Sequence, residues 1–115
     1  MLTEKDYCDY DTCVALEELG YPRYCYDNGG ELDKILRMVT LYNAQKWLRE
    51  KGIDVCIEVN TKNDRLSDKY YTVCISYMSR IKREYQYLNE NFNTYEEALL
   101  EGIKAAIRIL KEERK

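Results

Sequence analysis

TYEEALLEGIKAAIRIL, residues 94–110, is the stretch that decides the fold class of this chain. Thr94 and Glu97 have the spacing of a capping box, in which the hydroxyl accepts from the third helical N–H and the carboxylate reaches back. Apolar residues then recur at helical spacing, which predicts a helix packed on another element. Gly102 costs a helix interior about 1 kcal/mol relative to alanine, so we expect a close approach to a neighbour there. The apolar stripe consists of Tyr95, Leu99, Ile103, Ala106 and Leu110.

Two segments before this helix alternate apolar and polar residues, as half-buried strands do. A polar loop over residues 62–65 joins them into a hairpin, and a third strand is expected over Arg83–Leu88. A hairpin centred on Arg65 would place Cys56 opposite Cys74 across the strands. The apolar positions are Ile53, Val55, Ile57 and Val59 in the first segment and Tyr71, Val73, Ile75 and Tyr77 in the second.

Helices are also predicted before the strands. Residues 40–51 have a Thr40 cap and a terminal Gly52, with an apolar stripe between them. A shorter helix begins after Asp9 or Asp11 and ends at the Gly20-Tyr21-Pro22 sequence. Residues 23–26 are a candidate short strand. Residues 35–39 either extend the longer helix backwards or form an extended lead-in to it, and the extended form is the one that we favour. The stripe of the longer helix consists of Leu41, Ala44, Trp47 and Leu48.

These elements predict an α+β fold with two layers, in which helices cover one face of a three-stranded antiparallel sheet. The length of 115 residues favours a single domain, residues 1–115. We divide it into a helical extension over residues 1–39 and an α-β-β-β-α core over residues 40–112.

Composition excludes several classes of protein. The chain has 18 basic and 21 acidic residues and a net charge of −3, which argues against binding driven by nucleic-acid phosphates. No apolar stretch approaches the roughly 18 residues of a membrane span. The first residues are acidic and polar, so we expect no secretory signal peptide and a cytoplasmic protein.

The chain has five cysteines and no histidine. Cys8, Cys13 and Cys25 lack the closely spaced pairs that zinc sites use, so we predict no metal and no cofactor. Cys13 is expected in the core, with Cys8 and Cys25 as partly exposed thiols. Cys56 and Cys74 are either a redox pair or two incidental thiols of the sheet.

Catalytic motifs are equally sparse. Without histidine, the Ser-His-Asp and Cys-His mechanisms are absent. The carboxylates near each end fit helix capping and exposed helix faces better than a paired-carboxylate site. Asn28-Gly29-Gly30 lacks the lysine and the flanking elements of a phosphate loop. We therefore predict a protein that is not an enzyme.

Twelve tyrosines accompany one Phe and one Trp, and tyrosine suits both half-exposed sheets and protein contacts. The face of the sheet that no helix covers is the predicted region of protein contact. It would bind a partner protein or a second copy of the chain in a homodimer. The alternative is that solvent or the N-terminal segment covers it. We call the six predicted residues the contact face: Cys56, Glu58, Tyr70, Thr72, Cys74 and Ser76.

The α-β-β-β-α order is similar to the topology of double-stranded-RNA-binding domains. Those domains carry lysines at the start of the last helix, where they meet phosphates. This chain has Tyr95, Glu96 and Glu97 there. The carboxylates would repel an RNA backbone, which argues against RNA binding.

Two motifs carry a further resemblance, AQKWLRE at residues 44–50 and YEEALLEGI at residues 95–103. They resemble a group of small uncharacterised proteins from Bacteroidales genomes, often near prophage or mobile-element genes. Thr94, Glu97 and Ala98 are also similar to the helix start of HicB-type antitoxins, although those proteins begin with strands. Together these features predict a non-enzymatic interaction or regulatory module of mobile-element origin. A nucleic-acid-binding or HicB-like regulator and a small enzyme are the alternatives.

Overall fold

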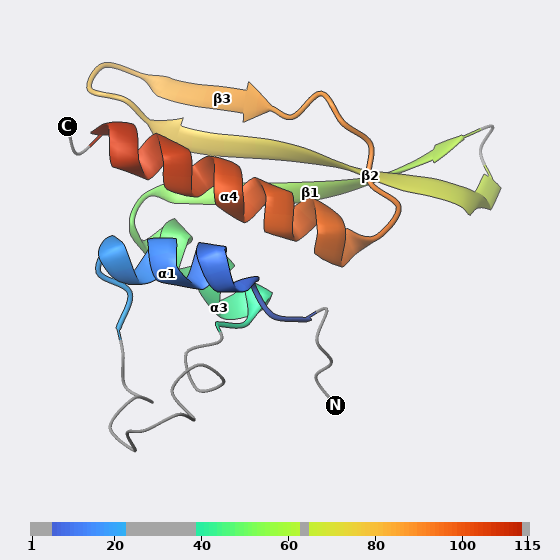
Figure 1. Ribbon diagram of the computed structural model, residues 1–115. Helices are drawn as coiled ribbons and strands as arrows, with labels where there is room; N and C mark the ends of the chain where they lie inside the picture. Colours follow the sequence, from blue (N-terminus) through green and yellow to red (C-terminus); the bar gives the residue numbers. More distant parts are fainter. Residues whose placement is uncertain (1–5, 23–38, 63–64, 114–115) are drawn as a thin grey trace, which may run out of the picture.

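A computed structural model describes residues 6–22, 39–62 and 65–113 of the chain. It has the predicted α+β architecture, with helices packed on a three-stranded antiparallel sheet (Figure 1). The candidate strand at residues 23–26 and most of the extended segment 35–39 lie outside the described residues. The elements are α1 (Tyr10–Glu18), α3 (Leu41–Glu50), β1 (Ile53–Lys62), β2 (Arg65–Met78), β3 (Arg83–Tyr87) and α4 (Tyr95–Glu113).

The sheet is a meander in the order β1-β2-β3. The predicted hairpin register is confirmed, because Cys56 and Cys74 are Cα partners across β1 and β2. β3 pairs with the second half of β2, where Tyr87 is opposite Cys74 and Tyr85 is opposite Ser76. Since side chains of directly opposite residues share a face, this register fixes the composition of both faces.

Helix α4 packs on the apolar face of the sheet, and the Thr94 half of the predicted capping box is confirmed. The Thr94 hydroxyl oxygen accepts a hydrogen bond from the Glu97 N–H at 3.1 Å. Gly102 is buried against β1 and β2, and a Cβ atom added there would lie 2.6 Å from Val55 Cγ1 and 3.0 Å from Val73 Cγ1. The glycine therefore permits the helix backbone to approach the sheet more closely than any side chain would.

Helix α3 contacts both α4 and β1. Its predicted stripe is confirmed, because Leu41, Ala44, Trp47 and Leu48 are all buried. On the next face of this helix, Gln45 Nε2 donates to the backbone oxygen of Val55 at 2.7 Å. An amide side chain thus satisfies one backbone acceptor of the edge strand β1.

Asp9 is the N-cap of helix α1, and its carboxylate accepts from the Thr12 N–H at 2.8 Å. Lys104 of α4 reaches the same carboxylate at 3.1 Å. The residue before the cap, Cys8, donates its N–H to the oxygen of Val39 at 2.8 Å. This links the start of α1 to the segment that enters α3.

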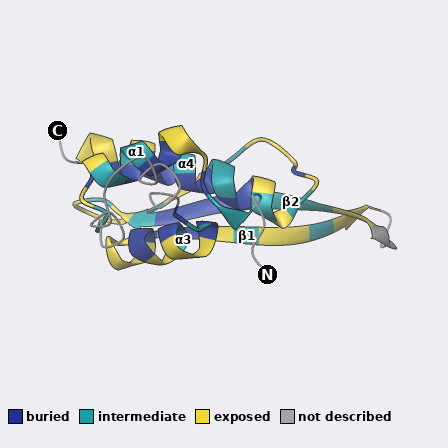
Figure 2. Cartoon of the chain, turned by 60° about the horizontal axis from the view of Figure 1, so that its bottom comes forward, coloured by how far each residue is buried: buried dark blue, intermediate teal, exposed yellow. Residues whose placement is uncertain are grey.

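Two predictions of burial are wrong. Cys8 was expected to be partly exposed, but only 1% of its surface is accessible because it lies in the core beneath α1. Val59 continues the apolar alternation of β1, yet it is 60% exposed. Figure 2 shows the reason, since the β1–β2 ribbon extends beyond the ends of the helices and its outer part is exposed.

Replacing Gly102 by alanine tests the close packing of α4. We expect Gly102→Ala to lower the free energy of unfolding by about 1–2 kcal/mol, because overpacking against Val55 and Val73 outweighs the gain in helix propensity. Denaturant unfolding measures this change. In a Val55→Ala background the penalty should shrink, and an equal penalty in both backgrounds would refute the contact.

Acid unfolding tests the Asp9 cap. Burial alone would raise the pKa of Asp9, but hydrogen bonds from Thr12 and Lys104 outweigh it and lower the pKa. A lowered pKa in the folded state stabilises the fold above the ordinary carboxyl pKa of about 4, and this stabilisation disappears as the pH falls through the folded value.

At neutral pH, Asp9→Ala should cost roughly 0.5–2 kcal/mol. Asp9→Asn keeps a capping oxygen but cannot titrate, so the stability difference between wild type and Asp9→Asn should vanish in acid. A difference that persists below the folded pKa would contradict this assignment.

Candidate functional site

The face of the sheet opposite the core is the candidate site, and we call it the helix-free face. None of its side chains belongs to the apolar core cluster of the described residues. Across the strands it forms rows of directly opposite residues. The central row is Cys56, Cys74 and Tyr87, and its neighbours are Asp54, Ser76 and Tyr85 on one side and Glu58 with Thr72 on the other.

The six residues of the predicted contact face all lie on this face, but they do not contribute equally. Cys56 and Glu58 are exposed, and Tyr70 and Thr72 are half-buried. Cys74 and Ser76 are each only 9% exposed, so they add little accessible surface of their own to this face. They lie on the central strand, where side chains from both neighbouring strands surround them.

Strand β3 explains the burial of Cys74 and Ser76. Arg83 Nη1 donates to the hydroxyl oxygen of Ser76. Hydrogen bonding to Cys74 raises the pKa of the Tyr87 hydroxyl. The Ser76 hydroxyl and the Cys74 thiol are therefore engaged by β3.

Tyr85 and Tyr87 are the residues that the sequence analysis missed. They are 60% and 66% exposed and lie on the helix-free face, opposite Ser76 and Cys74. Met78, at the end of β2, is 55% exposed on the same face. The alternation in REYQY, residues 83–87, would have identified the tyrosines once the pairing of β3 with β2 was known.

Charges on this face are distributed unevenly across the strands. Asp54 and Glu58 lie on β1, and the side chain of Arg49 is 3.9 Å from the Asp54 carboxylate. Cys56, between the two carboxylates, has its sulfur 3.6 Å from Asp54 Oδ2. Partial burial and the neighbouring Asp54 carboxylate raise the pKa of the Cys56 thiol. The β1 side is therefore acidic, and Arg83 supplies a positive charge on the β3 side.

Farther along the ribbon, polar contacts order the side chains. Asn60 Nδ2 donates to the Thr72 hydroxyl oxygen at 3.0 Å. The Lys62 ammonium lies 6.0 Å from the centre of the Tyr70 ring. Contacts between cations and rings at this distance are weak on an exposed surface, so Tyr70 keeps its ring available to a partner.

A second thiol pair is buried beneath α1. The Cys13 sulfur accepts from the Val39 N–H at 3.4 Å and lies 3.7 Å from the Cys8 oxygen. Hydrogen bonds from Cys8 and from the Val39 N–H lower the pKa of the Cys13 thiol. The Cys8 thiol donates to Cys13 and is buried, and both effects raise the pKa of Cys8. Both thiols are almost inaccessible, which places them in the core rather than in a site. Cys25 lies outside the described residues.

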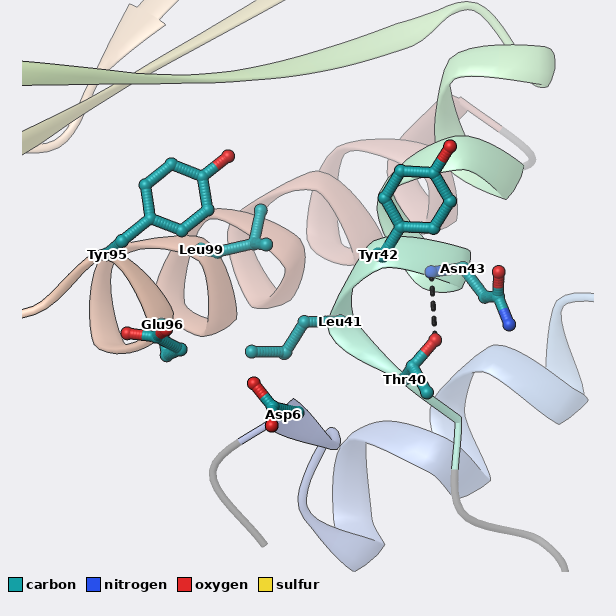
Figure 3. A pocket seen from close by; sticks show the side chains of 8 residues that line it. All are labelled: Asp6, Thr40, Leu41, Tyr42, Asn43, Tyr95, Glu96 and Leu99. Atoms are coloured by element: carbon teal, nitrogen blue, oxygen red, sulfur yellow. Dashed lines mark hydrogen bonds between the residues drawn. The ribbon is translucent and has the colours of Figure 1, made fainter. Parts of the chain in front are cut away.

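A hollow of about 480 Å³ lies between the first turns of α3 and α4 (Figure 3). Leu41 and Leu99 line it between the helices, Tyr42 and Tyr95 point in the same direction, and Glu96 lies on the opposite side. Its lining, among the described residues, includes no basic side chain to bind a phosphate.

Within residues 6–22, 39–62 and 65–113, no three Cys, Asp or Glu side chains gather closely enough to hold a metal ion. None of the helices in this part of the chain has the length and apolar content needed to cross a membrane. The fold and site define a two-layer α+β protein with one open sheet face. No family model, curated protein or solved structure matches the chain.

Alkylation rates test the environments of the thiols. Cys56 should react with iodoacetamide in the native protein, whereas Cys8 and Cys13 should react only as fast as the fold opens. Asp54→Asn should accelerate the reaction of Cys56 at neutral pH roughly two- to fivefold, less than the tenfold of one full pKa unit. Peptide mapping by mass spectrometry assigns each rate.

Asp54→Glu is the matched control, because it keeps a carboxylate beside the thiol. If Asp54→Asn and Asp54→Glu react at the same rate, the carboxylate does not control Cys56.

Proposed function

We propose that this chain is a non-enzymatic module that binds a protein partner on the helix-free face. The observation that supports this most is the exposure of Tyr85, Tyr87 and Met78 beside Cys56 on one uncovered sheet surface. Tyrosine, methionine and arginine are the residues that protein interfaces favour. Clustered exposed apolar side chains on a small domain are typical of interaction sites.

The charge distribution specifies the chemistry of the partner. The acidic β1 side, with Asp54 and Glu58, favours basic groups on the partner. The β3 side offers the aromatic rings of Tyr85 and Tyr87, which favour apolar or aromatic side chains. The partner that fits best is therefore a protein surface with an apolar centre and with lysine or arginine on the side that meets β1.

Nucleic acid fits this surface less well. Phosphates require a concentration of basic side chains, whereas Glu58 and Asp54 lie on the open face and Glu96 and Glu97 are in the first turn of α4. The resemblance to proteins encoded near prophage genes agrees with a small accessory protein of a mobile element, acting through a protein contact.

Capture of a partner from the host extract tests the proposal. We expect the tagged wild-type chain to retain a specific protein and Tyr70→Glu to weaken that binding at least about tenfold, because the substitution removes an aromatic contact and places a carboxylate against the apolar centre of the partner. Quantitative mass spectrometry measures the retained protein, and a titration with the purified partner gives the affinity.

Tyr42→Glu is the matched control, because it makes the same chemical change away from the sheet face. Tyr42 lies on α3 and is 64% exposed. This variant should bind as wild type does. If Tyr42→Glu abolishes binding and Tyr70→Glu does not, the partner binds near the hollow of Figure 3 and the proposal is wrong.

A further inference from the structure

The two edges of the sheet differ in how they are covered. β1 is flanked by α3, whose Gln45 side chain bonds the backbone oxygen of Val55. β3 forms the opposite edge, and Figure 1 shows no other described element beyond it. An uncovered strand edge presents unpaired N–H and C=O groups that another strand can bind.

The hydrogen bonds to β2 reveal which backbone groups of β3 face outward. The Leu88 N–H donates to the Val73 oxygen at 3.1 Å, and at the other end the Ser79 N–H donates to the Lys82 oxygen at 2.8 Å. In an antiparallel ladder hydrogen-bonded pairs alternate, so Glu84 and Gln86 also direct their backbone groups to β2. Arg83, Tyr85 and Tyr87 direct theirs away from the sheet.

We propose that β3 pairs antiparallel with β3 of a second copy of this chain, with Tyr85 opposite Tyr85 of the second copy on the two-fold axis. In this register the outward backbone groups of residues 83, 85 and 87 pair with those of residues 87, 85 and 83 of the second copy. Each hydrogen-bonded pair exchanges two bonds, so the three pairs give about six.

Charge selects this register among those that the backbone permits. Arg83 is opposite Tyr87 of the second copy, and Glu84 is opposite Gln86, so no like charges meet. A register shifted by two residues toward the β2–β3 hairpin places Glu84 opposite Glu84 of the second copy, and this pair of like charges is unfavourable. Sliding the strands the other way leaves Arg83 opposite Asn89, which lies beyond the strand. Only the register centred on Tyr85 pairs all of β3 without repulsion.

The pairing has a consequence for the helix-free face. Opposite residues of paired strands lie on the same side of a sheet, so the two-fold axis is perpendicular to the sheet and the two helix-free faces become continuous. The two copies form one six-stranded sheet with Tyr85 and Tyr87 of both at its centre. Helix α4 packs on β1 and β2, which leaves β3 accessible for this contact.

A cross-linking experiment tests the register. Directly opposite residues of a hydrogen-bonded pair have Cα atoms about 5.5 Å apart, which is within the range that a disulfide spans. In a Cys56→Ser background, Tyr85→Cys should form a disulfide between position 85 of the two copies on mild oxidation with oxidised glutathione. Gln86→Cys, the matched control, should not link to itself, because it is opposite position 84.

Sedimentation equilibrium tests the charge pattern. Tyr87→Glu places a carboxylate opposite Arg83 of the second copy, and Tyr87→Arg places a like charge there. We expect the first to tighten the dimer and the second to weaken it, each by about two- to thirtyfold, the range for two cross-strand pairs. Tyr85→Pro removes an outward N–H that β2 does not use and should give a monomer, with circular dichroism as the check of folding.

A wild-type chain that stays monomeric at high protein concentration overturns the pairing, as does a dimer that neither Tyr85→Pro nor Tyr87→Arg weakens. The partner-binding proposal is tested separately by Tyr70→Glu, on the part of the face remote from β3. Loss of one activity with retention of the other distinguishes the two proposals.

Discussion

The close contact of Gly102 with Val55 and Val73 fixes the distance between α4 and the sheet. Because α4 lies directly on β1 and β2, its long apolar stripe buries the centre of one sheet face. Ile103 and Ala106 of α4 and Ile75 of β2 are fully buried as a result. α3 then packs against both α4 and β1, and α1 completes the core through Leu16 and Cys13.

This arrangement leaves three parts of the sheet uncovered. The helices do not reach the outer part of the β1–β2 ribbon, where Val59 is exposed (Figure 2). They also leave the helix-free face and the β3 edge open. The open surfaces carry tyrosine, methionine and a few charges rather than a uniform polar layer, which is the composition expected of contact surfaces.

The chemistry of the chain agrees with a role in binding. Cys8 and Cys13 are buried. Partial burial and the neighbouring Asp54 carboxylate raise the pKa of the Cys56 thiol and so reduce its reactivity. The hollow between α3 and α4 is lined by carboxylates, tyrosines and leucines. The face that combines exposure, aromatic rings and an unpaired strand edge is the sheet surface that ends at β3.

By itself the sequence determined the local elements, because they depend on short-range periodicity and capping. The Thr94 cap, the α3 stripe and the β1–β2 register follow from spacings within about twenty residues of one another, as does the crowding expected at Gly102. Tertiary structure alone decided how much of each face is covered. Val59 became exposed because the helices end before the outer part of the β1–β2 ribbon, and Cys8 became buried because the segment before α1 packs into the core. Cys74 and Ser76 were covered, and Tyr85 and Tyr87 presented, because β3 pairs with β2 in a register that short-range patterns do not specify.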